Sequence, residues 1–316
     1  MSWFVLKRFV VFAATLLAAS VVVFVALEVL PGDPARVILG VDAPESAVTA
    51  LRAKLGLDRP AAERYLHWIG ALAQGQLGTS YTYSVPVVEL IEARLQITLP
   101  LALMAMLLSV VAALGLGLYA ASQHNRPGDV LVMGISQLGI SIPNFWLALL
   151  LIVLFAVQLK WFASGGFPGW EAGPWAALKA LVLPAVALAT VQGAILARFT
   201  RSAVLETMRE DYVRTARAKG LSRRQALWRH VLRNAMIPIV TVMGLQFANL
   251  LAGTIVVENV FALPGIGRLI LQSISNRDLA AVRDVVMLLA AVVVLVNFVV
   301  DLLYAAIDPR LKAADT

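Results

Sequence analysis

Cysteine is absent from this 316-residue chain, and charged side chains are scarce. The lack of cysteine excludes disulfide bonds and thiolate metal ligands. The three histidines stand at positions 67, 124 and 230, far from the short spacing of a metal site. Only 14% of the residues are charged and 60% are hydrophobic, whereas a soluble domain has about 25% charged residues. This composition indicates a membrane protein.

Enzymatic motifs are missing as well. No GxxxxGK followed by serine or threonine occurs, so the chain has no phosphate-binding loop for ATP. HExxH is absent, and no histidine lies in an apolar stretch where it could activate a serine for intramembrane proteolysis. We therefore expect no enzymatic activity.

Ionisable residues are also missing from the centres of the apolar stretches. This absence disfavours an ion-coupled carrier or pump, which keeps such residues within its spans. A sodium site made of carbonyls and hydroxyls stays open. Uphill transport by this chain would have to draw its energy from another polypeptide.

Six stretches of the chain lack Asp, Glu, Lys and Arg. They cover residues 9–27, 95–123, 130–159, 180–197, 234–257 and 285–300. A helix needs about 20 apolar residues to cross a bilayer, so the first five suffice as they stand. The sixth reaches this length if Asp301 lies near the headgroups and the helix continues beyond it. The sequence thus predicts an all-α polytopic membrane protein with six transmembrane helices.

Basic residues are concentrated in one connecting segment. Residues 198–233 hold ten basic and three acidic residues, whereas residues 31–94 hold six and seven. Cytoplasmic loops collect Lys and Arg, and six spans place both ends of the chain on one side. We therefore expect segment 198–233 and both termini, with Arg310 and Lys312, in the cytoplasm, and the protein in the plasma (inner) membrane. The net charge of +7 then reflects topology and contact with anionic lipid, without nucleic acid.

This topology divides the chain into three parts. They are an N-terminal end with the first span (1–30), an extracytoplasmic segment (31–94) and a five-span transmembrane domain (95–316) with a cytoplasmic loop at 200–235. In the extracytoplasmic segment we expect two short amphipathic helices, at 44–57 and 60–73, that open with Pro44 and Pro60. They form either a cap over the membrane domain or a docking surface for an extracytoplasmic partner.

The segment 258–284, after the fifth span, is too polar to cross the membrane twice. We expect a re-entrant loop or an outer helix there. Arg277 and Asp278 are neighbours in it, and we expect them to form an exposed ion pair of little energetic value.

Polar residues recur at helical spacing in two spans. Gln137, Ser141 and Asn144 are spaced for one face of the third span, and Pro143 should kink that helix. Gln246 and Asn249 form a similar stripe in the fifth span, together with a glycine. Such stripes serve helix packing or a polar route for a solute, and the sequence leaves both open.

The basic loop is predicted to fold as helix, tight turn and helix. Gly220 is expected to take the left-handed conformation that ends the first helix, and Ser222 to cap the second, which runs from Arg223 to about Ala235. Three interpretations exist: a helix-turn-helix that reads DNA, a plain loop whose charge sets topology, and a docking element for a cytoplasmic motor. The first is disfavoured because the flanking spans leave no room for a three-helix core.

The sequence of this loop, from "YVRTARAKGLS" to "HVLRNAMIP", resembles the cytoplasmic loop of ABC importer permeases of the dipeptide and oligopeptide subfamily. Further similar stretches are "LPGDPA", "GISIPNFWLALLL", "VENVFALPGIGRL" and "VNFVVDLLYAAIDPR", so the likeness covers nearly the whole chain. One departure is visible. The Glu-Ala-Ala that opens the loop in importers generally is Arg214-Thr215-Ala216 here, as is usual for the peptide subfamily.

The resemblance implies a permease subunit of an ATP-binding-cassette importer for dipeptides or oligopeptides. Alternatives are nickel chelates, glutathione or oligosaccharides within the same family, or a self-sufficient carrier or channel. The implied partners are a second, homologous permease, two cytoplasmic ATPases, an extracytoplasmic solute-binding protein and membrane lipid. The chain itself would hold no cofactor, because ATP and Mg²⁺ would bind to the ATPases.

The same resemblance assigns two sets of residues. Those expected to couple to the ATPases are Asp211, Ala216, Lys219, Gly220, Leu221, Ser222, Ala226 and Leu227. Those expected to line the translocation pathway between spans two to five are Gln137, Ser141, Asn144, Gln246 and Asn249.

Overall fold

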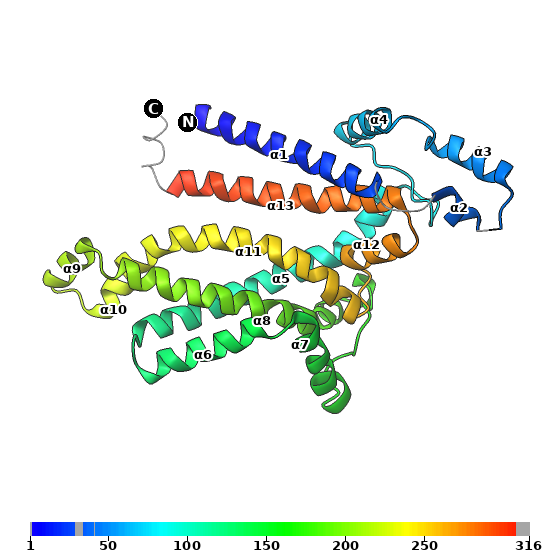
Figure 1. Cartoon of the computed structure of the whole chain (residues 1–316). Coiled ribbons are helices and arrows are strands. Elements are labelled where there is room, and N and C mark those ends of the chain that lie inside the picture. Colours follow the sequence, from blue (N-terminus) through cyan, green and yellow to red (C-terminus); the bar gives the residue numbers. More distant parts are fainter. Residues whose placement is uncertain (1, 29–33, 41, 308–316) are drawn as a thin grey trace. The chain divides into compact units, whose positions relative to one another are not determined.

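The computed structural model describes residues 2–28, 34–40 and 42–307, and within these ranges every regular element is a helix (Figure 1). The prediction of an all-α protein is confirmed. Residues 30–33 of the "LPGDPA" motif, and Arg310 and Lys312, lie outside the described residues.

Five of the helices are long and apolar enough to cross a membrane. They are α1 (Ser2–Glu28), α5 (Val87–Ser122), α8 (Pro174–Thr207), α11 (Leu232–Val260) and α13 (Leu279–Ile307). A sixth span consists of α6 (Pro127–Ser141) and α7 (Asn144–Leu151), which continues as a π-helical turn, Ile152–Gln158. The two parts meet at an angle of 100°. The six predicted spans are therefore found if this bent pair is counted as one.

The bend corrects one prediction. Ile142 and Pro143 are both extended, with ψ of 122° and 135°, so the helix stops after Ser141 instead of kinking. A residue before proline is pushed out of the helical region by the proline ring, and proline has no N–H to continue the ladder. Asn144 starts a helix in a new direction. It does not share a helix face with Gln137 and Ser141.

The chain forms two compact units. Unit 1 comprises Leu99–Leu263 with Met1–Arg8 and Val296–Thr316, and unit 2 comprises Phe9–Thr98 with Pro264–Leu295. In unit 1, α8 contacts α6, α7 and α11, and Figure 1 shows α6 and α11 running along it. Its buried side chains are mostly alanine and leucine. Helix α8 is therefore the centre of unit 1.

Neighbouring helices approach α8 closely where one partner lacks a side chain. A Cβ added to Gly117 of α5 would lie 2.7 Å from the Cβ of Thr200 and 2.8 Å from the carbonyl oxygen of Ala197. On α6, a Cβ added to Gly139 would lie 3.2 Å from the Cβ of Ala194. Small residues let helices pack in lipid, where no hydrophobic force draws them together.

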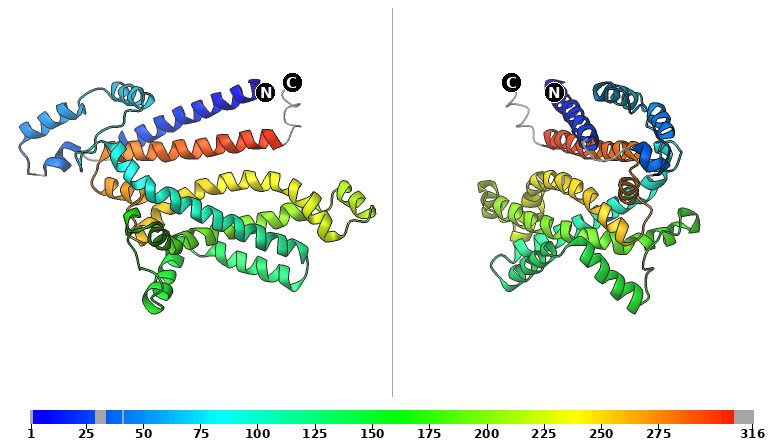
Figure 2. Two further views of the ribbon diagram at one scale, coloured as in Figure 1. Left: turned by 180° about the vertical axis from the view of Figure 1, so that it is seen from behind. Right: turned by 45° about the vertical axis from the view of Figure 1, so that its right-hand side comes forward.

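Unit 2 holds the two short helices expected in segment 31–94. They are α3 (Glu45–Leu55) and α4 (Ala61–Ala73), each preceded by its proline as the N-cap residue, and a shorter helix, α2 (Pro34–Leu39), comes before them. Helix α1 runs beside α13 in this unit (Figure 2), where Phe24 and Met287 pack with Trp68 of α4. The helix expected after the fifth span is α12 (Ile266–Ser275).

The expectation that Arg277 and Asp278 form an exposed ion pair is wrong, because Asp278 is not exposed. The side chain of Asp278 is fully buried and accepts hydrogen bonds from Ser80 Oγ at 2.5 Å and from the N–H groups of Thr82 and Ala281. A buried carboxylate needs such donors because it has lost its water. Asp278 thus anchors the loop before α5 to the start of α13.

We expect Gly117→Ala to lower the stability of the chain. The new methyl group would overlap backbone and side-chain atoms of α8, and overpacking of this kind costs about 1–3 kcal/mol. Gly115→Ala is the matched control, because no atom lies within 4 Å of its added Cβ; alanine there should be neutral or stabilise by up to about 1 kcal/mol. Thermal unfolding of the detergent-solubilised chain, followed by tryptophan fluorescence, checks both. Equal melting temperatures for the two variants would contradict the close approach.

Candidate functional site

The basic loop between α8 and α11 folds as helix, turn and helix, as predicted. Helix α9 (Asp211–Ala218) ends in a turn in which Gly220 has φ of +96°, and α10 (Arg223–Ala226) follows. This φ favours glycine because a Cβ would be strained there. The N–H groups of Gly220 and Leu221 donate to carbonyls of the last turn of α9, at 3.0 and 3.3 Å, so the helix end is satisfied.

Ser222 caps the second helix through a reciprocal pair of hydrogen bonds. The N–H of Gln225 donates to Ser222 Oγ at 3.3 Å, and the N–H of Ser222 donates to Gln225 Oε1 at 3.0 Å. Such a capping box stabilises a helix start. The second helix differs from expectation only in length. It does not end near Ala235 but passes through a π-helical turn, Leu227–Val231, directly into α11.

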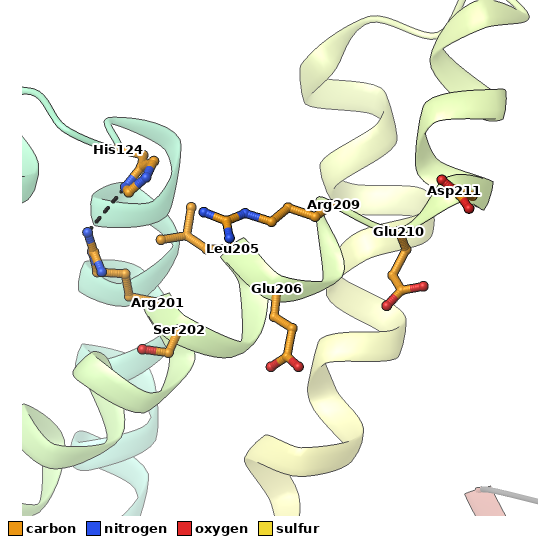
Figure 3. Close-up of a pocket in the computed structure, with 8 residues that line it drawn as sticks. All are labelled: His124, Arg201, Ser202, Leu205, Glu206, Arg209, Glu210 and Asp211. Atoms are coloured by element: carbon orange, nitrogen blue, oxygen red, sulfur yellow. Dashed lines mark hydrogen bonds between the residues drawn. The ribbon is translucent and has the colours of Figure 1, made fainter.

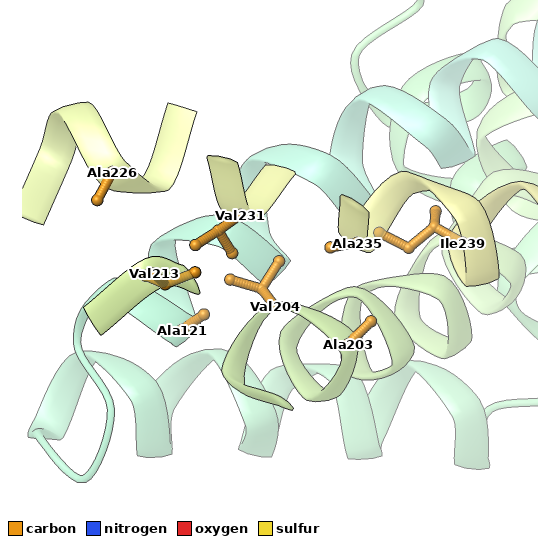
Figure 4. Packing of buried hydrophobic residues seen from close by; sticks show 8 residues of the cluster. All are labelled: Ala121, Ala203, Val204, Val213, Ala226, Val231, Ala235 and Ile239. Atoms are coloured by element: carbon orange, nitrogen blue, oxygen red, sulfur yellow. The ribbon is translucent and has the colours of Figure 1, made fainter. Parts of the chain in front are cut away.

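A cluster of small apolar side chains fastens the loop to the spans (Figure 4). Val213 of α9 lies near Val204 of α8 and Val231 of the π-helical turn, and all three are at most 2% exposed. Burying a valine side chain contributes about 1.5–3 kcal/mol. Three such contacts are enough to hold the short helix α9 against the ends of α8 and α11.

The residues assigned to coupling are brought together by this fold, at different depths. Those on its surface are Asp211, Lys219, Gly220 and Ser222, and Leu221 and Leu227 are half-buried. Ala216 and Ala226 are 8% and 2% exposed. The two small alanine side chains therefore allow α9 and α10 to pack closely against the rest of the chain. The exposed surface of the loop is the turn between α9 and α10.

An ion pair that sequence reasoning missed joins α6 to α8 near this loop. Arg201 donates from Nε to Asp129 Oδ1 at 2.5 Å and from Nη2 to Asp129 Oδ2 at 2.6 Å, and Asn125 N–H donates to the same carboxylate at 3.0 Å. His124 Nδ1 lies 3.2 Å from Arg201 Nη2 (Figure 3). Bidentate arginine–carboxylate pairs of this kind are stronger than pairs joined by one hydrogen bond. The only sequence signal was an acidic residue at the edge of an apolar stretch.

A groove of about 640 Å³ lies beside this ion pair. Its lining, shown in Figure 3, is His124, Arg201, Ser202, Leu205, Glu206, Arg209, Glu210 and Asp211. Both basic and acidic side chains line it, so it can receive polar groups of either sign. Near its end, burial raises the pKa of the Tyr212 phenol, and the charge of Glu210 adds to the effect. The phenol therefore stays neutral and able to donate a hydrogen bond.

The residues assigned to the pathway fall into two groups. Gln137 accepts a hydrogen bond from Arg198 of α8 at 2.9 Å, and Ser141 Oγ donates to the carbonyl of Gln137 at 2.9 Å. All three of these side chains are exposed in the single chain. Arg198 was not foreseen, because it follows the fourth apolar stretch directly and was counted with the loop.

The second group lies between α7 and α11. Asn249 Nδ2 donates to Gln246 Oε1 at 2.9 Å, and Gln246 is 5% exposed. Asn144 reaches α11 at Gly253, where an added Cβ would lie 3.3 Å from its Nδ2. The Oδ1 atom of Asn144 is buried and accepts no hydrogen bond from the described residues. A buried acceptor without a donor is costly, so this amide is suited to a bound polar group.

The chain belongs to the family of binding-protein-dependent transport system inner membrane components. The model of that family matches residues 113–313, and the model of its N-terminal region matches residues 1–102. Family membership makes the chain a multi-pass membrane permease of the ABC importer class, of the dipeptide and oligopeptide type, without enzymatic activity. It also implies ATPase subunits and a solute-binding protein as partners.

Named relatives align over almost their whole length. A protein of Brucella abortus (strain 2308), named as a peptide transport system permease, is 40% identical over 99% of both chains. A glutathione transport system permease of Escherichia coli O6:H1 is 42% identical over 98% of both chains.

Solved structures share the fold. A chain of the methionine ABC transporter MetNI, in an inward-facing conformation, is 19% identical with a TM-score of 0.58, over 69% of this chain and 96% of that one. A chain of an amino acid ABC transporter solved with histidines is 18% identical with a TM-score of 0.51, over 71% and 94%. At these identities the likeness supports the architecture alone.

We expect Asp129→Asn to destabilise unit 1 by roughly 2 kcal/mol. This loss of stability is smaller than the loss of about 3–5 kcal/mol expected when a fully buried pair is broken, because the side chain of Arg201 is still 21% exposed. Asp211→Asn is the control, since that side chain is 93% exposed and its pair with Arg214 is worth little. Thermal unfolding measures both.

The double variant Asp129→Asn with Arg201→Gln completes a mutant cycle. If the pair acts as described, the double variant loses less stability than the sum of the two single variants. Additive losses would show that the two side chains do not interact.

Proposed function

We propose that the chain is the permease subunit of an ABC importer that carries peptides across the plasma (inner) membrane. Its two ends and the loop between α8 and α11 face the cytoplasm, and segment 31–94 faces the outside, in agreement with the balance of charges. It pairs with a second, distinct permease as a heterodimer. The chain binds no cofactor, because ATP and Mg²⁺ are held by the ATPase subunits.

One observation carries the coupling role: α9, the Gly220 turn and α10 are packed onto the spans, and α10 runs into α11 without interruption. A force applied to the turn therefore reaches α11 through the helix and α8 through the contacts of Val213 and Val204. The Asp129–Arg201 ion pair extends this connection to α6. Closure of the ATPases would move these helices as a body and change the access of a central pathway.

The proposed pathway residues suit a substrate with a peptide backbone. Side-chain amides donate and accept hydrogen bonds at once, so Gln137, Asn144 and Asn249 can pair with amide groups whatever the side chains of the substrate. Gln246 accepts a hydrogen bond from the Asn249 amide and holds it in place, whereas Ser141 donates to the backbone carbonyl of Gln137. Two relatives are named for peptide and for glutathione transport, and glutathione is itself a tripeptide, which supports the same substrate class. Nickel chelates and oligosaccharides are the alternatives within the family.

We expect Gly220→Asp to abolish uptake while the protein stays in the membrane. A charged side chain on the turn would block the contact with the ATPase, and φ of +96° would strain it. Gly166→Asp is the matched control, because Gly166 also has a positive φ, of +82°, with no atom within 4 Å of an added Cβ. The measurement is uptake of a labelled dipeptide by cells that lack other peptide importers, with membrane levels determined by immunoblotting. Normal uptake by Gly220→Asp would remove the coupling role.

We also expect this chain alone, reconstituted into liposomes, to pass no peptide. The complete assembly of two permeases, two ATPases and the binding protein should accumulate peptide only with ATP and Mg²⁺. Competition by unlabelled dipeptides, longer peptides, glutathione, nickel chelates and oligosaccharides then identifies the substrate. Flux through the chain alone would instead support a self-sufficient channel or carrier.

A further inference from the structure

A second cavity, of about 460 Å³, lies in unit 2 and has a strongly basic lining. It is formed by the end of α3, the turn to α4, helix α4 itself, the loop after α4 and the start of α13, with Phe24 of α1. The basic residues that line it are Lys54, Arg59, Arg64, His67 and Arg283, and no Asp or Glu is among its lining residues. A cavity with this composition attracts an anion.

The side chain of Arg283 is positioned by a buried hydrogen-bond network that involves Trp68 and Asp284. Its guanidinium lies 4.8 Å from the centre of the Trp68 ring, and its Nε lies 3.4 Å from Asp284 Oδ1. Asp284 is fully buried on its side chain and also accepts from Trp68 Nε1 at 2.9 Å and from the N–H of Gly78 at 2.7 Å. The terminal nitrogens of Arg283 donate to none of the described residues. The planar group is therefore fixed, with donors left for a ligand.

The charge of the lining is only partly balanced. Arg59 pairs with Glu63 at 3.3 Å, outside the cavity, and Asp284 faces Arg283. Lys54 forms no ion pair with the described residues. Burial raises the pKa of the Tyr81 phenol, which also lines the cavity, so it stays neutral and can donate a hydrogen bond.

We propose that this cavity receives the carboxylate of an Asp or Glu side chain on the solute-binding protein. The inference rests on the proposed function, which places segment 31–94 outside. A guanidinium with free N–H groups donates two parallel hydrogen bonds to a carboxylate, and Lys54 adds a second positive charge. The peptide substrate is the less suitable ligand, because every residue proposed for its pathway belongs to unit 1. The carboxylate would orient the binding protein on the permease and speed their association.

Zero-length cross-linking tests the contact directly. In the complete importer, reconstituted in zwitterionic lipid with its solute-binding protein, a carbodiimide should join Lys54 Nζ to an Asp or Glu of that protein. Mass spectrometry of the digested product identifies the two residues. Lys54→Arg should abolish this cross-link and keep the affinity, because the charge is retained and the amine is lost. Arg277→Lys is the control, since it introduces an amine at an exposed position of unit 2 outside the cavity and should give no such product.

Affinity gives an independent measurement. We expect Lys54→Gln and Arg283→Gln each to weaken binding of the solute-binding protein by about tenfold or more, whereas Arg277→Gln should leave it unchanged. Arg283 packs on Trp68, so thermal unfolding must show that its variant is folded, and Lys54→Gln gives the result if it is not. Unchanged affinity in Lys54→Gln, together with the absence of a cross-link, overturns the proposal.

Two further experiments distinguish a carboxylate of the solute-binding protein from other anions that could occupy the cavity. A loss of affinity in the variants that occurs only with phosphatidylglycerol in the membrane would assign the cavity to a lipid headgroup and overturn the proposal. A loss of labelled dipeptide binding in the absence of the solute-binding protein would assign it to the substrate, with the same consequence. If the unaltered assembly neither binds the solute-binding protein nor imports peptide with ATP, the proposed function itself fails, which is a different result from failure in the variants alone.

Discussion

Close contact between α8 and its neighbours is the constraint on which unit 1 depends. Gly117 and Gly139 bring α5 and α6 so near to α8 that a methyl group would not fit, or would fit only with a shift of its neighbours. In lipid, helices are held together by such contacts and by hydrogen bonds, because the lipid chains are as apolar as the side chains. Helices that interlock at this distance cannot slide past one another. They move together or separate.

Charge supplements this packing at the α9 end of α8. Asp129 and Arg201 join α6 to α8 through two hydrogen bonds, and the valine cluster joins α9 to α8 and α11. The two kinds of contact differ in range and in direction. Apolar packing resists separation of the surfaces, whereas the paired hydrogen bonds also fix their orientation. The end of unit 1 that bears the loop is therefore held by both kinds of contact.

The sequence predicted those features that depend on neighbouring residues. Charge-free stretches located the spans, and Gly220 and Ser222 located the turn and the second helix, because caps and left-handed turns are set within a few positions. Pro44 and Pro60 located α3 and α4 for the same reason. The family resemblance, carried by whole motifs, was confirmed by the family match.

Contacts between distant residues were not predictable in this way. Asp129 and Arg201 are 72 positions apart, and Gln137 and Arg198 are 61 apart, so no spacing along one helix indicates either pair. Asp278 was misassigned because its partners, Ser80 and Thr82, lie almost 200 positions away. The break at Pro143 was foreseen as a kink only, since a sequence indicates that a helix is disturbed there but not by what angle.

The π-helical turn Leu227–Val231 has a consequence for how the two ends of α11 are oriented. In it the N–H of Leu232 donates to the carbonyl of Leu227, five residues back, instead of four. Each residue of a helix advances its azimuth by about 100°. The one additional residue thus sets the rotational phase, about the helix axis, between the Gly220 turn and the polar residues Gln246 and Asn249 further along α11. A homologue that lacked this residue would present the turn between α9 and α10 to a different side of α11.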